Sequence, residues 1–313
     1  MNIKETIVLA KKQKGRYKAF PTAVRLNDGV VVAYRDGVVD PTKPHGSSGM
    51  VRLLRSRDFK EFVVFDTPFR DNELDAIISG PFDERLVLFS RSYEHGLRNE
   101  SYVSSFSVDE LPQNRRRVQI EGVDIAAFFG HPIPFKDGFV ATAYGAYNKK
   151  PSPLLLYTED WLEFSFLSAI TPDGFEPNLN ETSIVKTDRG FLAIMRSREP
   201  SYELYYSLSD DLIVWSEPKR LEILGHAPMV RRLKNSMFCM VFRHLEADSW
   251  GVGLAKSKDG IDWDVFRIHS YSGDLYNGGY GDFVEIDGDN LFVVYYTSDR
   301  DNEPWIEAKI VEL

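Results

Sequence analysis

Four arginine residues occupy matching places in the sequence, each near the end of an apolar run that follows a polar turn. Arg35, Arg91 and Arg196 each come five residues after the run begins, and Arg243 comes one residue later. A guanidinium group is planar and always charged, so it binds a carboxylate or phosphate through two parallel hydrogen bonds. Since arginine is seldom buried unless it is paired, the pattern predicts a shared anion-binding site. The alternative is that nearby acidic residues neutralise each arginine and that the four only seal a rim.

The elements that must position these side chains are six predicted β-hairpins, each with a short strand, a polar turn and a longer apolar strand. The strand runs are rich in Val, Ile, Phe and Tyr, and no long stretch has a helical period. The hairpins cover residues 21–37, 75–92, 131–145, 181–197, 227–244 and 280–298.

A second repeat places Ser or Thr two residues before an Asp, with an aromatic residue a few positions beyond it. Copies begin at residues 56, 107, 158, 209 and 257, and the copy at 107 lacks the aromatic residue. The spacing is close to 50 residues throughout. Ser, Thr and Asp side chains accept hydrogen bonds from the backbone amides of a tight turn, so each copy predicts a turn between two strands.

Together the two repeats predict an all-β fold, a six-bladed β-propeller that forms a single domain over residues 1–313. Each blade would hold four strands. The last blade runs out at its third strand, residues 305–313, and the N-terminal segment 4–11 would supply its fourth strand and close the ring.

In such a blade the first strand begins, and the second strand ends, near the axis on the same face. The alignment therefore predicts two sets of side chains at one mouth. The strand starts supply Lys18, Asp75, His131, Glu181, His226 and Tyr280. The strand ends supply Arg35, Arg91, Tyr144, Arg196, Arg243 and Tyr296.

Composition narrows the classes of function. The formal net charge of −9 argues against binding to nucleic acid or to an anionic membrane surface, because both need a basic face. The single cysteine, Cys239, excludes an intramolecular disulfide. No apolar run is long enough for a membrane helix or a secretory signal, so we expect a cytoplasmic protein. We expect no cofactor and no metal, since His131 and His226 have no third ligand at a useful spacing.

The turns resemble the Asp boxes of the sialidase (neuraminidase) superfamily, and Ser257–Trp263, with the sequence SKDGIDW, is the best copy. The resemblance extends over almost the whole chain. It implies a six-bladed propeller and an exo-glycosidase that releases a terminal nonulosonic acid with retention of configuration. The family's site holds the substrate carboxylate with three arginines, and it uses a Tyr nucleophile, a Glu that activates it and an Asp acid/base.

Carried over by motif, the resemblance assigns Glu181 of Asn180-Glu181-Thr182 as the activating carboxylate. It assigns Tyr280 as the nucleophile. Arg196 and Arg243 stand at two of the three arginine positions.

Two positions depart from the family pattern. The motif of the first arginine reads Lys18-Ala19-Phe20-Pro21 here, so Lys18 or Arg35 would take its place. The acid/base position lies near His45, with Asp36 and Asp40 upstream. A histidine with an ordinary pKa of about 6.5 can protonate a leaving oxygen at neutral pH, so His45 or Asp40 is expected to be the acid.

The expected partner is an acidic carbohydrate or glycoconjugate, and two other functions fit the same residues. An arginine that neutralises a uronate, beside a Tyr/His pair, also describes a polysaccharide lyase. A propeller that binds glycans without catalysis is the third possibility.

Overall fold

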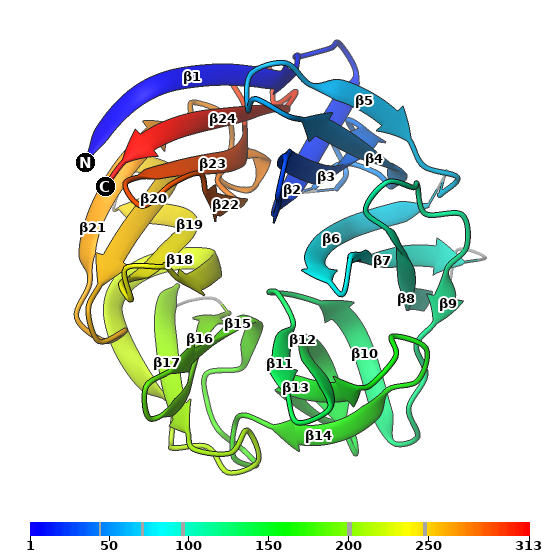
Figure 1. The fold of residues 1–313 in the computed structure, drawn as a ribbon, viewed down its shortest axis with the longest axis vertical. Coiled ribbons are helices and arrows are strands. Elements are labelled where there is room, and N and C mark those ends of the chain that lie inside the picture. Colours follow the sequence, from blue (N-terminus) through cyan, green and yellow to red (C-terminus); the bar gives the residue numbers. More distant parts are fainter. Residues whose placement is uncertain (44, 70–71, 95–97, 199–201, 247–248) are drawn as a thin grey trace.

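The computed structural model describes residues 1–43, 45–69, 72–94, 98–198, 202–246 and 249–313. These residues form strands β1 to β24 and one short 3-10 helix, η1 (Leu275–Asn277). Among them no helix is long and apolar enough to cross a membrane. The sheets stand side by side in a ring around a central axis (Figure 1). The all-β prediction is therefore confirmed.

The first sheet joins two groups of strands through a single pair, Gly49 with Glu73. Its neighbours in the hydrogen-bonded order are successive strands of the chain, apart from β5, which pairs with β4 only. The strands are β2 (Arg16–Leu26), β3 (Gly29–Val38), β4 (Gly49–Ser56), β5 (Val63–Asp66), β6 (Glu73–Phe82), β7 (Arg85–Glu94), β8 (Arg98–Ser107) and β9 (Arg116–Arg117).

The second sheet has two short inner strands where one was expected. Both pair with the same long neighbour, β12, at different parts of its length. The strands are β10 (Val123–Phe128), β11 (Ile133–Phe135), β12 (Gly138–Tyr147), β13 (Lys150–Thr158) and β14 (Ser165–Ala169).

The longest strand of the third sheet is β18. Its first part pairs with β17 and its second part pairs with β19. One strand thus completes one group and begins the next. The strands are β15 (Leu179–Thr187), β16 (Gly190–Ser197), β17 (Glu203–Ser209), β18 (Lys219–Arg232), β19 (Phe238–Glu246), β20 (Ser249–Ser257) and β21 (Asp264–Ser270).

The fourth sheet joins the two ends of the chain. Its order is β1 (Asn2–Ala10), β24 (Trp305–Glu312), β23 (Asn290–Thr297) and β22 (Gly281–Glu285), and β1 runs antiparallel to β24 from Asn2 to Ala10. The N-terminal segment thus pairs with the last strand of this sheet in the chain, as the sequence predicts. All six predicted hairpins are also antiparallel strand pairs.

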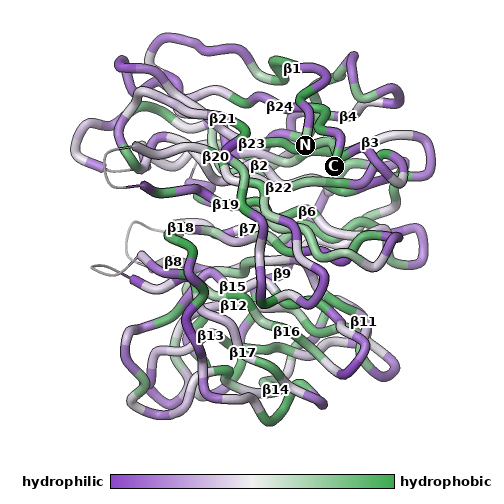
Figure 2. Tube along the Cα trace, turned by 90° about the vertical axis from the view of Figure 1, so that its left-hand side faces the viewer, coloured by the Kyte–Doolittle hydropathy of each residue, from purple (hydrophilic) through white to green (hydrophobic). Residues whose placement is uncertain are grey.

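The predicted turn chemistry is present in four copies of the second repeat. One carboxylate oxygen of Asp58, Asp160, Asp211 and Asp259 accepts hydrogen bonds from two backbone amides, two and three residues further on. In each copy the next residue has a positive φ, between 63° and 81°. These turns follow β4, β13, β17 and β20, and the strands carry hydrophobic residues through the interior (Figure 2).

The core is divided between the faces of neighbouring groups of strands. One cluster packs β2, β3 and β4 against β6, β7 and β8, for example Leu53 and Ile78. Another packs β19 and β20 against β22 and β23, for example Val241 and Phe283. Because the sheets pack face to face around the axis, the inner strands are held rigidly at the centre.

Candidate active site

A cavity of about 770 Å³ opens where the inner strands meet near the axis. Five cationic side chains line it, from Arg35, Lys43, Arg91, Arg196 and Arg198, against two acidic ones, from Asp75 and Glu181. The cavity is thus positively charged in a protein whose net charge is −9. A concave site with this imbalance attracts an anionic ligand.

β-Bulges project the inner residues into this cavity. Pairing shifts register between Ala19 and Thr22, between Asn180 and Ser183, and between His226 and Met229. Within these bulges Phe20, Glu181 and Ala227 have φ values of 56°, 35° and 53°, and all three line the cavity. A bulge re-aims one side chain, and for a residue other than glycine such a φ costs about 1–3 kcal/mol.

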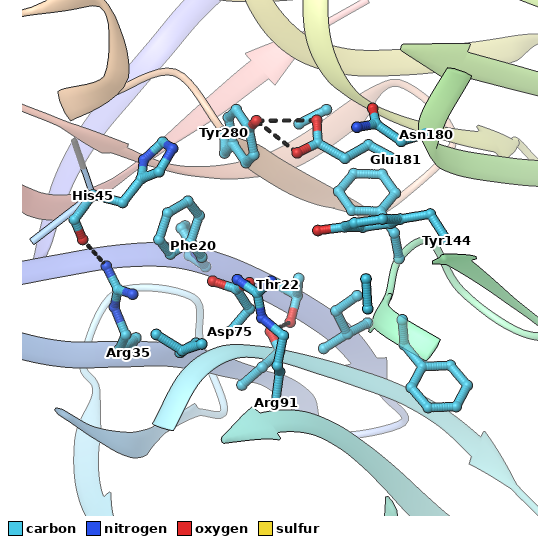
Figure 3. A pocket seen from close by; sticks show the side chains of 18 of the residues that line it. Phe20, Thr22, Arg35, His45, Asp75, Arg91, Tyr144, Asn180, Glu181 and Tyr280 are labelled. Carbon is cyan, nitrogen blue, oxygen red and sulfur yellow. Dashed lines mark hydrogen bonds and ion pairs between the residues drawn. The ribbon is translucent and has the colours of Figure 1, made fainter. Parts of the chain in front are cut away.

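The best-connected group in the cavity is Tyr280, Glu181 and Arg196. The Tyr280 hydroxyl donates to Glu181, with Oη 2.8 Å from Oε1 and 3.0 Å from Oε2 (Figure 3). Arg196 Nη1 lies 2.9 Å from Glu181 Oε1 and 3.0 Å from Tyr280 Oη. The predicted nucleophile, its activator and one predicted arginine therefore meet in the cavity. They come from the start of β22, from β15 and from β16, respectively.

The electrostatics keep the phenol protonated in the free protein. Burial raises the pKa of Tyr280 well above its ordinary value, the guanidinium groups of Arg196 and Arg243 lower it, and Glu181 raises it. The hydroxyl therefore enters any reaction as a neutral donor whose proton already points at a carboxylate. That arrangement suits a nucleophile paired with a base.

Asp75 and Arg91 form an ion pair on the other side of the cavity in the view of Figure 3, with Arg91 Nη2 2.5 Å from Asp75 Oδ2. Tyr144 also lines the cavity, and burial raises its pKa to about 12. All three were predicted at the mouth and stand there.

Arg35 also lines the cavity, but its charge is directed into the protein. Only 2% of the residue is exposed. Its Nη2 donates to the His45 carbonyl oxygen, and its guanidinium carbon lies 4.8 Å from the Phe20 ring centroid and 5.3 Å from that of Tyr17. Arg35 thus holds in place the loop that carries His45.

The surroundings of His45 and Asp40 do not favour either residue as the acid at neutral pH. His45 lines the cavity, but burial, together with the charge of Arg243, lowers its pKa to about 3. Its imidazole is therefore neutral at pH 7. Asp40 is not among the described residues that line the cavity, and its Oδ1 accepts hydrogen bonds from the backbone and side chain of Thr42. The other upstream candidate, Asp36, is buried and paired with Arg16.

Arg243, Tyr296 and His226 were predicted at the mouth and instead lie behind it. All three are fully buried, and none is among the described residues that line the cavity. Arg243 Nη2 donates to Tyr296 Oη at 2.9 Å, and its Nη1 lies 3.1 Å from His226 Nδ1. For His226 the physical reason is the bulge, because Ala227, one residue further on, lines the cavity in its place.

Lys18 is also a correction, since it does not line the cavity. It stands two residues before the bulged Phe20, and its Nζ donates to the Lys11 carbonyl oxygen at 2.6 Å. Phe20, and not Lys18, therefore lines the cavity at the start of this hairpin.

His131 was predicted at the mouth but is not among the described residues that line the cavity, because β10, and not β11, is the inner strand of its sheet that lines it. It belongs to a group that we call the axial cluster, in which Ser79 and Asp282 are fully buried and His131 and Arg231 are partly buried. His131 Nδ1 is 2.8 Å from Ser79 Oγ, and its Nε2 is 2.8 Å from Asp282 Oδ2. Arg231 Nη2 lies 3.1 Å from both carboxylate oxygens of Asp282. The cluster ties together β6, the loop before β11, β18 and β22.

Several lining residues carried no usable sequence signal. Lys43 and Arg198 lie in loop segments after β3 and β16. Phe128 and Phe129 form part of an apolar wall together with Leu74, Ile77 and Met229. The Asn180 Oδ1 and the His45 Nδ1 are buried without a hydrogen-bond partner among the described residues, so a bound ligand with hydroxyl groups would satisfy both.

A metal site is not evident in the described part of the chain, where no group of three or more His, Cys, Asp or Glu side chains could hold an ion.

No family model and no curated protein matches the sequence. Solved structures do share its fold. A protein of unknown function from Dyadobacter fermentans has a TM-score of 0.84 and 16% identity, over 100% of this chain and 99% of its own. An α-L-arabinanase from Penicillium chrysogenum, complexed with arabinobiose, has a TM-score of 0.73 and 11% identity over 100% and 99% of the two chains.

A sialidase from Trypanosoma rangeli, in complex with 2,3-difluorosialic acid as a covalent intermediate, has a TM-score of 0.72 and 11% identity. It matches 97% of this chain, which spans 59% of the sialidase. The chain thus has the propeller fold found in two kinds of glycoside hydrolase, and the resemblance to sialidases is confirmed at the level of fold.

Proposed function

We propose that this protein is a sialidase-like exo-glycosidase, which releases a terminal acidic sugar by way of a Tyr280-linked intermediate. The observation that carries the proposal is the Tyr280–Glu181–Arg196 group in a cavity with an excess of cationic side chains. A sugar whose anomeric carbon bears a carboxylate repels a carboxylate nucleophile. A neutral phenol avoids that repulsion, and sialidases are a known exception to catalysis by two carboxylates.

We also infer that the scaffold is a propeller of six blades. The six hairpins each begin a group of strands, with β4, β8, β13, β17, β20 and β24 as the respective third strands. The groups of the first and third sheets are joined only at Gly49–Glu73 and along β18. When these joined groups are counted separately, the described strands form six groups, one for each blade.

In the first step the Tyr280 oxygen attacks the anomeric carbon while its proton passes to Glu181. The bond from that carbon to the leaving oxygen breaks, and the leaving oxygen takes a proton from an acid. In the second step water attacks the same carbon and gives a proton to the conjugate base of that acid, while the Tyr280 oxygen departs and recovers its proton from Glu181. Each step is a displacement at the anomeric carbon assisted by proton transfers, as in general acid–base catalysis, and the transfer between Tyr280 and Glu181 joins groups already in hydrogen-bond contact.

We assign the acid/base role to Asp75. It is the second carboxylate among the described residues of the cavity lining, and His45 is neutral at pH 7. In the free protein Asp75 is paired with Arg91. A substrate carboxylate that binds Arg91 would weaken this pair and let Asp75 hold the proton that the leaving oxygen needs.

Arg91, Arg196, Arg198 and Lys43 are the cations that we expect to hold the acidic sugar. Arg243 is excluded from direct contact by its burial behind Tyr280. The recognition of the carboxylate thus differs from the arrangement that the sequence resemblance implies.

A uronate-polysaccharide lyase is the second candidate, and the state of His45 favours it. A neutral imidazole whose Nδ1 has no partner among the described residues could accept a proton from a sugar carbon. A pKa of about 3 makes it a weak base, so we rank this function below hydrolysis.

The test is a turnover screen over aryl glycosides of nonulosonic, ulosonic and uronic acids, with product analysis. Parent protein, Tyr280→Phe and Glu181→Gln are compared. We expect hydrolysis by the parent and loss of turnover in both variants. An unsaturated product would show a lyase. Binding to a glycan array without turnover, unchanged in both variants, would show a non-catalytic glycan-binding propeller.

A further inference from the structure

Arg243 lies directly behind the ring of Tyr280. Its guanidinium carbon is 4.2 Å from the ring centroid, a distance at which a cation and an aromatic face attract one another. Arg243 is fully buried at the end of β19. It therefore meets the phenol from the side opposite to the cavity, where a substrate cannot compete for it.

Two glycines directly before Tyr280 allow the backbone to lie close to the Arg243 side chain. Gly279 has a φ of 90°, and a Cβ atom there would lie 2.7 Å from Arg243 Cγ. A Cβ on Gly278 would lie 2.8 Å from the Tyr271 ring. The two glycines let the chain pass over the guanidinium and place the ring of Tyr280 on it.

Hydrogen bonds fix the guanidinium without neutralising it. Nε donates to the Gly278 carbonyl oxygen at 2.7 Å and Nη2 to Tyr296 Oη at 2.9 Å, while Nη1 lies 3.1 Å from His226 Nδ1. Burial and the neighbouring arginines lower the pKa of His226, so its imidazole is neutral and can accept. Within the described residues no carboxylate forms an ion pair with Arg243. A buried cation without a counter-ion acts strongly on its neighbours.

We propose that Arg243 is a positioning residue for Tyr280, and that its buried charge stabilises the phenolate form of that tyrosine. The inference rests on the proposed function for its role in catalysis. When the second step expels the Tyr280 oxygen from the anomeric carbon, that oxygen gains negative charge before Glu181 returns the proton. A fixed cation behind the ring makes it a better leaving group, because the stabilisation exists before the charge develops.

Other groups act on the same phenol and are kept constant in the test. Glu181 on β15 accepts its proton, Arg196 on β16 contacts its oxygen, and Tyr296 on β23 packs at a ring-centroid distance of 6.2 Å. Phe20 packs on the cavity side at 5.5 Å and carries no charge.

The test measures ionisation at position 280 without any substrate. A fluorinated tyrosine, which ionises at lower pH than tyrosine, replaces Tyr280 in the full chain, and ¹⁹F NMR follows its titration. We expect Arg243→Gln to raise the ionisation midpoint by about two pH units, from the attraction of charges about 5–6 Å apart. A shift below about half a unit would overturn the proposal.

Arg35→Gln is the matched control, since Arg35 is a second buried arginine that stacks on Phe20 and Tyr17. If Arg35→Gln shifts the ionisation midpoint as much as Arg243→Gln does, the proposal is also overturned, because the loss of any nearby positive charge would then have the same effect. If Arg243→Gln does not fold, Arg243→citrulline keeps the planar shape without the charge, and the same limits apply. Turnover is not measured, so failure here is separate from failure of the hydrolase proposal.

Discussion

Tyr280 and Glu181 are 99 residues apart in the chain, and the Tyr280 hydroxyl nevertheless lies between both oxygens of the Glu181 carboxylate. Glu181 reaches it from a bulge in which its own backbone has a φ of 35°. The strain of that backbone is offset by the surrounding sheet, and it aims the carboxylate at the phenol. Positive φ at a residue other than glycine is often found at functional sites.

Glu181→Gln is expected to reduce turnover by about 10²–10⁴-fold, because an amide keeps the size of the side chain but cannot accept the Tyr280 proton. Steady-state kinetics with an activated aryl glycoside would measure the loss. Thermal unfolding should show that the variant folds, and Glu61→Gln, an exposed turn residue, should retain full activity. Parent-like turnover in Glu181→Gln would remove Glu181 from the mechanism.

Asp75→Asn is expected to slow turnover of some substrates much more than others, depending on whether the leaving group needs a proton. A nitrophenolate departs without a proton, so the first step with such a glycoside should survive. An alkyl or sugar leaving group needs the proton, and its release should fall by at least about 10²-fold. The ratio of kcat/KM values for the two substrate types is the measurement. Equal losses with both would assign Asp75 to binding.

Acid should destabilise the protein through its buried neutral histidines. The folded-state pKa of His45 is about 3, and the unfolded value is about 6.5. Between these values the unfolded chain binds the proton and the folded protein does not, so stability is lost as the pH falls. In that window the free energy of unfolding should therefore change less steeply with pH in His45→Gln than in the parent, by up to about 1.4 kcal/mol per pH unit.

Urea unfolding over a pH series would measure this slope. Above about pH 7 the imidazole is neutral in both states, so parent and His45→Gln should have parallel curves there. Identical slopes in the acid window would show that His45 is exposed to solvent in solution.

Asp282→Asn is expected to lower the free energy of unfolding by about 3 kcal/mol, because it leaves Arg231 and His131 without their shared carboxylate. Burial opposes the ionisation of Asp282, but Arg231 and His131 outweigh it and hold its pKa well below the usual range. The contribution of Asp282 is present above about pH 4 and is lost on acidification. Urea titration at neutral pH would measure the change, with the exposed Asp289→Asn as control. A loss below about 1 kcal/mol would contradict a structural role for the axial cluster.

The fold was predictable because its signals are local. Alternating apolar residues and turn side chains act over a few positions, so the hairpins and turns could be assigned before any coordinates. Eight of the fourteen predicted site residues line the cavity, among them Tyr280, Glu181 and Arg196.

The other six were misplaced for reasons that depend on tertiary structure. A bulge adds one residue to a strand, and it puts Phe20 and Ala227 on the axis in place of Lys18 and His226. Arg243 is near the expected strand position, but the Gly278–Gly279 segment covers it. The pKa of His45 depends on burial by loops and strands remote in sequence, which spacing alone does not reveal.

The pairing of β1 with β24 has a consequence for biosynthesis. β1 emerges from the ribosome before β24, yet β24 is its only described strand partner. Until β24 has been synthesised, nearly three hundred residues later, the backbone donors and acceptors of β1 lack this partner, and an unpaired strand is prone to bind another chain. The pairing of β1 with β24 can therefore form only after β24 has been synthesised.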